Sequence, residues 1–330
     1  MTALREVTDA FTCFGSSCSV LVTGDGPGGS PVEVVARARS RMLGWHRSFS
    51  RFEPDSELSR LNRDPRTTVA VSPLMARFAA SVVRAGELTG GLVDATLVEE
   101  IETVGYRDEL GEPPPLETAL AAAPARSPAR ASDLVGWSLL DVDLASATIT
   151  RPPGVMLDSG GLAKGLFADV LAAELAGHEA FAVNCAGDLA IGGDGKVSRP
   201  VRVQSPFDGG IIHSFDVRAA GVATSGIGRR SWSDATGAPA HHLLDPHTGR
   251  PAFTGVVQVT AIAPSALLAE VRAKAAILSG PARAARWLPD GGVMVLDDAS
   301  HTVIAPLPSV TVGQLSAYAP DGLLGGRTFD

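Results

Sequence analysis

The stretch VMLDSGGLAKGLFADVLAAELAG, residues 155–177, decides the fold. Its first apolar residues predict a strand that ends at Asp158, and Gly160 and Gly161 predict a tight turn. The apolar residues that follow predict a helix over residues 162–177. Backbone N–H groups at such a helix start bind phosphate oxygens. The stretch therefore predicts a strand, a turn and a helix with an anion site, although it has neither P-loop nor GxGxxG spacing.

Lys164 stands in the first turn of the predicted helix, where a cation opposes the helix dipole. An anionic ligand beside the lysine would explain this choice. A solvated lysine next to a tight turn would explain it equally well. The stretch alone leaves both explanations open.

Outside this stretch, the pattern alternates between helical and extended segments. Helices are predicted over residues 31–49, 73–89 and 265–279, with Ser72 as the N-cap of the second one and glycines directly after it. The predicted strands cover residues 18–24, 137–143, 148–158, 180–187, 200–206, 213–226, 291–298 and 302–313. Because strands and helices do not alternate strictly, the fold class is predicted to be α+β.

Composition and charge exclude several classes of protein. The 330 residues are 45% hydrophobic and 19% charged, as in soluble globular proteins, and the net charge of −8 argues against general nucleic-acid binding. Three cysteines without a CxxC pair indicate a reducing compartment. Neither a signal peptide, nor a lipid anchor, nor an 18-residue apolar run is recognised, so a cytoplasmic location is expected.

The chain has no internal repeat and no clear interdomain linker. We therefore expect one domain over residues 1–330. The segment at about 111–132 is rich in proline and alanine and predicts a short helix between surface loops.

The stretch HHLLDPHTGRPA, residues 241–252, could be a metal site, a loop that carries a catalytic base, or a histidine-rich turn. Adjacent histidines on an extended chain point to opposite faces, so His241 and His242 cannot easily bind one ion. Asp245 and Gly249 suit a tight turn, which leaves His242 unexplained. A histidine, with an ordinary pKa of about 6.5, suits the deprotonation of a hydroxyl group.

Six segments in a fixed order carry a resemblance to a known family. They are FSRFEPDSELSRLN (49–62), TGGLVDATL (89–97), LDSGGLAKG (157–165), VNCAGDLAIGG (183–193), GVATSG (221–226) and HLLDPHTGRP (242–251). Together they resemble the ApbE family of FAD:protein FMN transferases. The resemblance extends from about residue 11 to residue 296.

The resemblance implies a single T-fold-like α+β domain of two lobes, with mixed sheets and flanking helices. It implies that FAD binds between the lobes, with magnesium at the pyrophosphate. The implied reaction moves FMN from FAD to a threonine or serine hydroxyl of an acceptor protein and releases AMP. Neither the acceptor nor the oligomeric state follows from the sequence.

Residue by residue, the resemblance implies a flavin site and a catalytic histidine. The positions that match flavin contacts are Phe14, Phe52, Leu92, Val93, Asp94, Asp158, Lys164 and Leu243. Phe52 stands where many relatives have a tyrosine against the isoalloxazine ring. His242 matches the proposed catalytic histidine, and we predict that it is the general base. His241 and His247 are predicted to lie at the surface.

The implied metal site departs from the family pattern. Its ligands in relatives are the carbonyl at the position of Gly161 and the aspartate and threonine of ADALATAL, where this chain has Glu270 and Lys274. A protonated lysine offers only donors and cannot ligate a cation. The two residues stand at i and i+4 on one predicted helix, so they could form an ordinary surface ion pair. Alternatively, the Lys274 ammonium group takes the place of magnesium. Ala186, where relatives usually have glycine, is a smaller departure.

Three functions remain open at this point. The chain could be an active flavin transferase with a modified or absent metal site. It could be a flavin-binding carrier or regulator of the same fold that has lost transfer. It could also be an FAD pyrophosphatase, in which water replaces the acceptor hydroxyl and the products are FMN and AMP.

Overall fold

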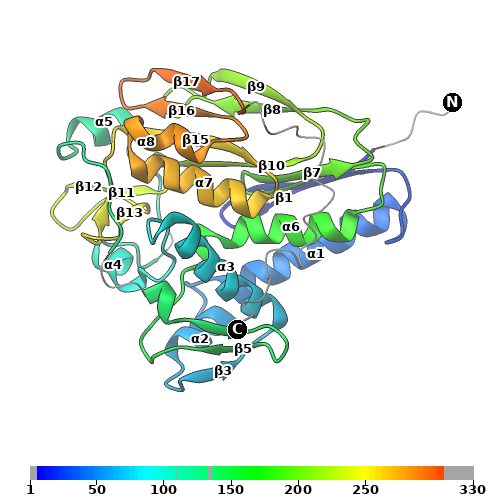
Figure 1. Ribbon diagram of the computed structural model, residues 1–330, viewed down its shortest axis with the longest axis horizontal. Coiled ribbons are helices and arrows are strands. Elements are labelled where there is room, and N and C mark those ends of the chain that lie inside the picture. The colour runs from blue at the N-terminus through cyan, green and yellow to red at the C-terminus, as the bar shows by residue number, and fades with distance from the viewer. Residues whose placement is uncertain (1–5, 109, 133–135, 308–330) are drawn as a thin grey trace, which may run out of the picture.

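The computed structural model describes residues 6–108, 110–132 and 136–307, and its largest element is an antiparallel sheet of eight strands (Figure 1). In spatial order the strands are β1 (Val7–Cys13), β2 (Ser16–Thr23), β6 (Ala180–Cys185), β7 (Asp188–Gly193), β10 (Ala220–Gly226), β15 (Val256–Ala263), β16 (Gly292–Leu296) and β17 (His301–Ile304). Buried aliphatic and aromatic side chains fill the space between this sheet and the helices. The predicted α+β class is confirmed.

Three long helices cover one face of the sheet: α1 (Pro31–Phe49), α6 (Ala163–Leu175) and α7 (Ala266–Ser279). Helix α3 (Pro73–Thr89) lies beyond them, next to α2 (Glu57–Arg63) and a small sheet of β3 (Thr68–Ala70), β5 (Thr148–Thr150) and β4 (Asp141–Asp143). The helices predicted over residues 31–49 and 73–89 have the predicted bounds.

Shorter elements complete the described chain. They are the helices α4 (Val98–Thr103), α5 (Leu116–Ala121) and α8 (Pro281–Ala284), the 3-10 turns η1 (Gly136–Leu139), η2 (Ser159–Gly161) and η3 (Ala285–Trp287), and the strand pairs β8 (Arg199–Gln204) with β9 (Ile211–Val217), β11 (Ser231–Ser233) with β12 (Pro239–His241), and β13 (Leu244–Asp245) with β14 (Arg250–Pro251). Helix α5 is the short helix predicted in the segment rich in proline and alanine. Over the described ranges, no helix has the length and apolar character that crossing a membrane requires.

Local signals explain where α3 begins and ends. The Ser72 hydroxyl accepts a hydrogen bond from the Met75 backbone N–H at 3.2 Å, and Pro73 occupies the first helical position. Gly90 adopts a left-handed conformation with φ of 61°, which a residue with a Cβ reaches only at a cost. The predicted cap and stop of this helix are therefore confirmed.

Helices α6 and α7 have buried residues on all sides, as expected for helices packed between a sheet and other helices. They cross closely at Gly165, where a Cβ atom would lie 2.7 Å from Cα of Leu267. The Asp169 carboxylate accepts hydrogen bonds from the backbone N–H groups of Ala266 at 2.7 Å and Leu267 at 2.9 Å. Helix α6 thus caps the first turn of α7 and fixes the position of the side chains on it.

The strand predicted over residues 148–158 is wrong beyond Thr150. Pro152 and Pro153 have no backbone N–H to donate, so residues 151–158 cannot extend the sheet. Instead, the Asn62 side chain accepts from the Leu157 N–H at 2.8 Å and donates to the Leu157 carbonyl at 2.9 Å. Asp158 therefore ends an extended segment held by a side chain, and not a strand.

Other predicted boundaries also differ from the structure. Strand β1 was not predicted, and the single strand predicted over residues 213–226 is divided between β9 and β10. The segment 137–143 forms η1 followed by a three-residue strand. The last predicted strand is confirmed only in β17, and its residues 308–313 lie outside the described part of the chain.

Candidate functional site

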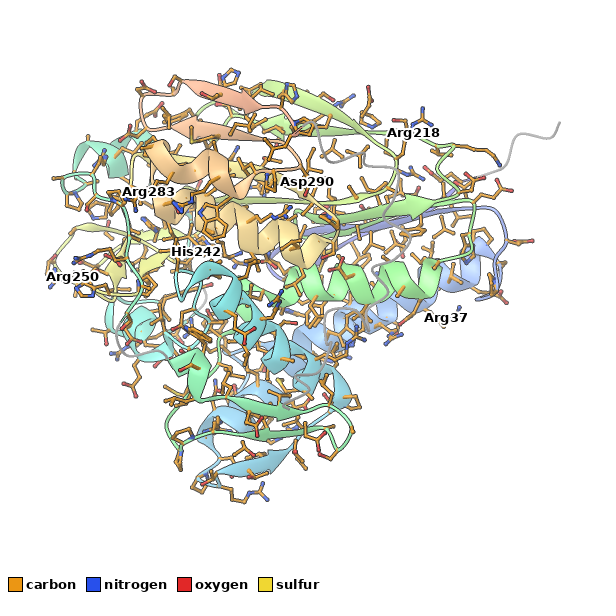
Figure 2. The ribbon with its side chains drawn as sticks, in the orientation of Figure 1. Arg37, Arg218, His242, Arg250, Arg283 and Asp290 are labelled. Atoms are coloured by element: carbon orange, nitrogen blue, oxygen red, sulfur yellow. The ribbon has the colours of Figure 1, made fainter. Side chains whose placement is uncertain are left out.

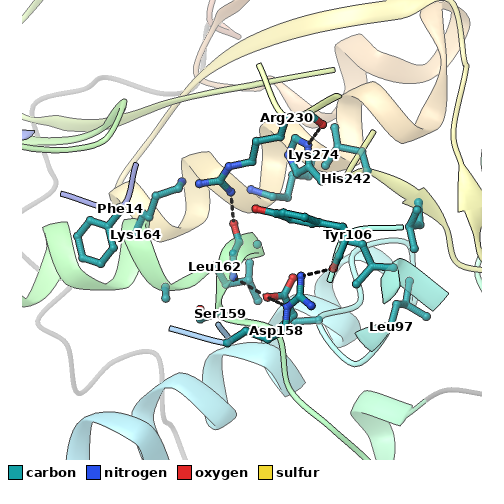
Figure 3. Close-up of a pocket in the computed structure, with 18 of the residues that line it drawn as sticks. Phe14, Leu97, Tyr106, Asp158, Ser159, Leu162, Lys164, Arg230, His242 and Lys274 are labelled. Carbon is teal, nitrogen blue, oxygen red and sulfur yellow. Dashed lines mark hydrogen bonds and ion pairs between the residues drawn. The ribbon is translucent and has the colours of Figure 1, made fainter. Parts of the chain in front are cut away.

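A cavity of about 500 Å³ lies beside α6 and α7, a volume typical of small-molecule sites (Figure 3). Eleven of the predicted site residues line it: Phe14, Phe52, Leu92, Val93, Asp94, Asp158, Gly161, Lys164, His242, Leu243 and Lys274. The remaining one, Glu270, lies behind the wall and contacts both lysines. The predicted positions, which are spread over 261 residues of sequence (274 − 14 + 1), thus gather in one place.

Four charged side chains that are each at most 14% exposed, Lys164, Asp188, Glu270 and Lys274, form a charge cluster behind and on the cavity wall. Oε1 of Glu270 accepts from Nζ of Lys164 at 2.9 Å and from Nζ of Lys274 at 3.0 Å. Its Oε2 accepts from the backbone N–H of Gly165 at 3.0 Å. Lys164 also forms an ion pair with Asp188. Lys164 therefore has carboxylate partners, so it is not the freely solvated lysine that the sequence left open.

The ion pair between Glu270 and Lys274 exists, but it does not lie at the surface. The Glu270 side chain is fully buried, and the Lys274 side chain is 8% exposed. Only the two lysines of the charge cluster line the cavity, while both carboxylates lie behind them. The hypothesis of an ordinary surface ion pair is therefore wrong.

The electrostatics of the charge cluster follow from its burial. Burial and the charge of Glu270 raise the pKa of Asp188 to about 7. Burial also acts to raise the pKa of Glu270, but Lys164 and Lys274 outweigh it and hold this pKa at about 2. Burial lowers the pKa of Lys274, and Glu270 opposes this shift. Asp188 and Glu270 raise the pKa of Lys164 despite its burial.

The residues at the implied metal positions do not fit a magnesium ion. Both oxygens of Glu270 already accept hydrogen bonds, and Lys274 offers only donors. A methyl group on Gly161 would lie 3.9 Å from Cε of Lys274, so the lysine stem lies beside the third implied ligand. Among the described residues, no three or more histidine, cysteine, aspartate or glutamate side chains are arranged to hold an ion.

The site also contains an aromatic group, which consists of Phe52, Tyr106 and Trp232. The ring centroids of Phe52 and Tyr106 lie 5.4 Å apart, and those of Tyr106 and Trp232 lie 5.3 Å apart. Phe52 and Tyr106 line the cavity. The Arg51 guanidinium lies 4.7 Å from the Phe52 centroid and 5.0 Å from that of Tyr106, close enough for cation–π attraction.

Arg51 also joins the aromatic group to the turn that contains Asp158. It donates to the Tyr106 carbonyl at 2.9 Å and to Glu102 at 3.1 Å, and its Nε lies 3.7 Å from Oδ1 of Asp158. The Asp158 carboxylate in turn accepts from the backbone N–H of Gly160 at 3.1 Å. The glycine turn is therefore held in place from the side of the aromatic group.

Two further predicted residues reach the cavity from tight turns. Phe14 has a positive φ of 54° and is followed by Gly15 at 68°, a two-residue turn that joins β1 and β2. This turn places the Phe14 ring at the cavity and 5.6 Å from that of Phe167. Asp94 accepts from the backbone N–H of Thr96 at 2.8 Å and from its hydroxyl at 2.6 Å, and burial raises the Asp94 pKa.

His242 has the geometry of a base that faces the cavity. Its Nδ1 lies 3.3 Å from the carbonyl oxygen of Arg230, and because a carbonyl only accepts, Nδ1 carries the proton. Nε2 therefore keeps the lone pair. Burial, assisted by the positive charges of Arg230 and Lys274, holds the pKa of His242 well below its usual value. In Figure 2, His242 lies below α7 toward the centre, whereas Arg250 lies at the outer edge.

The prediction that His241 lies at the surface is wrong. Its side chain is 1% exposed and packs against Phe253 with ring centroids 4.7 Å apart. His241 is the last residue of β12, and its Nδ1 accepts from the Leu243 N–H at 3.3 Å. Burial lowers the pKa of His241 to about 3. His247 is exposed, as predicted.

Several residues of the site were not predicted from the sequence. They are Arg51, Tyr106, Asp188, Arg229 and Arg230. Arg230 extends toward η2, the turn that contains Gly160, and its Nη1 lies 3.5 Å from the carbonyl oxygen of Gly160. With them, the cavity wall carries five cationic side chains (Arg51, Lys164, Arg229, Arg230 and Lys274) and two carboxylates (Asp94 and Asp158), although the whole chain has a net charge of −8.

The model of the ApbE family matches residues 14–296 of this chain. The chain belongs to the ApbE family. The FAD:protein FMN transferase of Klebsiella pneumoniae is 28% identical over 272 residues, which cover 79% of this chain and 75% of the relative. That of Salmonella typhimurium is 30% identical over 233 residues, which cover 67% of this chain and 64% of the relative.

Solved structures agree with this membership at the level of the fold. The ApbE protein of Thermotoga maritima is similar with a TM-score of 0.70 and 23% sequence identity, over 91% of this chain and 97% of that one. The ApbE fold therefore extends over nearly the whole chain. The roles of individual residues in this ApbE cavity stay predictions.

Proposed function

We propose that this protein is an FAD:protein FMN transferase. It would move the FMN half of FAD to a threonine or serine hydroxyl of an acceptor flavoprotein and release AMP. The observation that carries the proposal is a single cavity with a cationic wall, an aromatic group and a histidine whose Nε2 keeps its lone pair. The names of the curated relatives support it.

The cavity offers complementary surfaces for the two parts of FAD. The flat isoalloxazine ring would stack on the aromatic group through Phe52, because stacking needs only an aromatic face. The anionic pyrophosphate would bind among Lys164, Arg230 and Lys274. Phosphoryl transfer depends mostly on positioning and charge stabilisation, and these cationic groups supply both.

His242 would act as the general base in the transfer. Its Nε2 would take the proton of the acceptor hydroxyl as the hydroxyl oxygen forms a bond to the phosphorus of the FMN half. The bond from this phosphorus to the bridging oxygen would break, and AMP would leave with that oxygen. The cationic wall would stabilise the charge that develops on the leaving group.

One incubation distinguishes flavin transfer from the two other functions, an FAD pyrophosphatase and a flavin-binding carrier. The protein is mixed with FAD and a candidate acceptor, and in-gel flavin fluorescence and AMP are measured. A fluorescent acceptor band together with AMP supports transfer. AMP and free FMN without a labelled acceptor indicate an FAD pyrophosphatase, and bound FAD without AMP indicates a carrier.

Ligand preference gives a test that needs no acceptor. We expect tighter binding of FAD than of FMN, because the cationic wall and the aromatic group together suit a dinucleotide. Quenching of flavin fluorescence measures both affinities. Equal or tighter binding of FMN would contradict the proposal.

The cytoplasmic location stays a prediction of the sequence.

A further inference from the structure

Lys274 combines a buried stem with a charged group at the cavity. The residue lies on α7, one turn after Glu270, and its side chain is only 8% exposed. Its Cε lies beside Gly161, and its Nζ is held 3.0 Å from Oε1 of Glu270. Asp169 caps the start of α7, so the backbone that carries both residues is also fixed. The ammonium group is therefore preorganised and not free to swing into solvent.

The two lysines of the charge cluster differ in how far their charge is compensated. Nζ of Lys164 is shared between Asp188 and Glu270. Within the described residues, Lys274 forms an ion pair with Glu270 alone, and Glu270 is at the same time paired with Lys164. Of the two lysines, Lys274 thus keeps the larger uncompensated positive charge.

We infer that the Lys274 ammonium group, positioned by Glu270, binds the pyrophosphate of FAD and that the site therefore works without a divalent metal ion. The inference rests on the proposed function, because it assumes that FAD is the ligand. It follows from the misfit described above, since Glu270 has no oxygen without a hydrogen bond and Lys274 has no lone pair to offer. A fixed ammonium donates to phosphate oxygens as a compact point charge.

The first experiment measures FAD affinity of the parent protein by fluorescence quenching, with EDTA and then with magnesium in excess. We expect the two affinities to agree within about a factor of two, a negligible difference in binding free energy. FAD binding that is lost with EDTA and restored by magnesium would overturn the inference. A parent that binds FAD no better than FMN in both solutions would contradict the proposed function instead.

The second experiment removes the charge and keeps an unbranched side chain of similar length. In Lys274→Met we expect FAD affinity to fall by about 10- to 100-fold, the range of a hydrogen bond to a charged group. Binding of riboflavin, which has no phosphate, should stay at the parent level. The matched control is Lys196→Met, which removes a lysine whose side chain is 83% exposed and paired only with Asp194 in the described chain. Unchanged FAD affinity in a folded Lys274→Met would overturn the inference.

A third experiment uses two other variants, for the case in which Lys274→Met does not fold. Lys274→Arg keeps the charge, so it should keep FAD binding in EDTA. Glu270→Asp with Lys274→Thr restores two oxygen ligands, so its FAD binding should become dependent on magnesium. A double variant that binds FAD as tightly in EDTA as the parent does would show that Lys274 is not the group in question.

Discussion

The two sides of the cavity hold their side chains in different ways. The charge cluster of Lys164, Asp188, Glu270 and Lys274 belongs largely to two helices whose residues are mostly buried, and each charge is fixed by an opposite one. The aromatic group lies on loops and a short strand, and its rings are only partly buried. The difference follows from the interactions involved.

A buried charge without a partner is costly, so a charged wall needs partners whose positions are fixed in advance. Stacking depends on the ring face and tolerates small shifts, so loops can carry it. For FAD, this difference predicts that the charged side controls the phosphates and the chemistry. The aromatic side would control only the affinity for the flavin ring.

The largest expected effect concerns His242, which stands next to the charged side. In His242→Ala, transfer should be slower by about 10²- to 10⁴-fold, because the general base is lost. FAD affinity should change by no more than a few-fold, since the phosphates and ring keep their contacts. Flavinylation of an acceptor and fluorescence quenching measure the two effects. His247→Ala, an exposed histidine of the same segment, is the control. A His242→Ala variant that still transfers at nearly the parent rate would show that another group is the base.

The second effect concerns the stability of the charge cluster. Glu270→Gln removes the carboxylate that Lys164 and Lys274 share, so the free energy of unfolding should fall by about 3–5 kcal/mol. Urea denaturation measures the loss. The control is Asp194→Asn, which breaks the exposed pair with Lys196 and should leave the midpoint nearly unchanged. Equal effects in the two variants would show that the charge cluster behaves like a surface pair.

The third effect concerns the aromatic side alone. In Phe52→Ala, the affinity for riboflavin, FMN and FAD should fall by a similar factor of roughly ten, because base–aromatic stacking contributes ~1–3 kcal/mol. Phe52→Tyr keeps an aromatic face and should bind like the parent. Titration with all three flavins provides the comparison. A loss confined to FAD would place the phosphates, and not the ring, against Phe52.

The smallest expected effect is the absence of a pH dependence from His242 near neutrality. The pKa of His242 lies well below its usual value, so the base stays neutral as pH falls from about 8 to about 6.5. Loss of transfer through protonation of this histidine should appear only below this range. Lys274→Met removes a nearby positive charge, so it should raise this pKa and move this loss to higher pH. An acid limb centred at the ordinary pKa of histidine in the parent protein would contradict the assignment.

The lowered pKa of the neighbouring His241 predicts how the stability of the fold depends on pH. The folded protein resists protonation of His241, whose pKa is lowered to about 3, whereas the unfolded chain takes up the proton near pH ~6.5. The free energy of unfolding should therefore decrease as pH falls from ~6.5 to about 3. His241→Asn removes the titrating group, so its stability should depend less steeply on pH. Thermal melts at several pH values measure the difference.

The sequence by itself determined the elements whose signals are local. Ser72, Pro73 and Gly90 set the bounds of α3, because a cap, a first-turn proline and a left-handed glycine act within a few residues. The six ordered segments also determined the family, and they contain nine of the eleven predicted residues that line the cavity. Such short patterns can be recognised in the sequence without knowing where the segment lies in the fold.

Only the tertiary structure decided the surroundings of those residues. The sequence could not show that His241 packs under Phe253, that Asn62 holds Leu157 in place of a strand partner, or that Asp188 pairs with Lys164. Each of these contacts joins residues that are not neighbours in the sequence. Burial and charge pairing depend on everything that surrounds a group, so the pKa values and the fit of a metal ion follow from the packed molecule and not from local sequence.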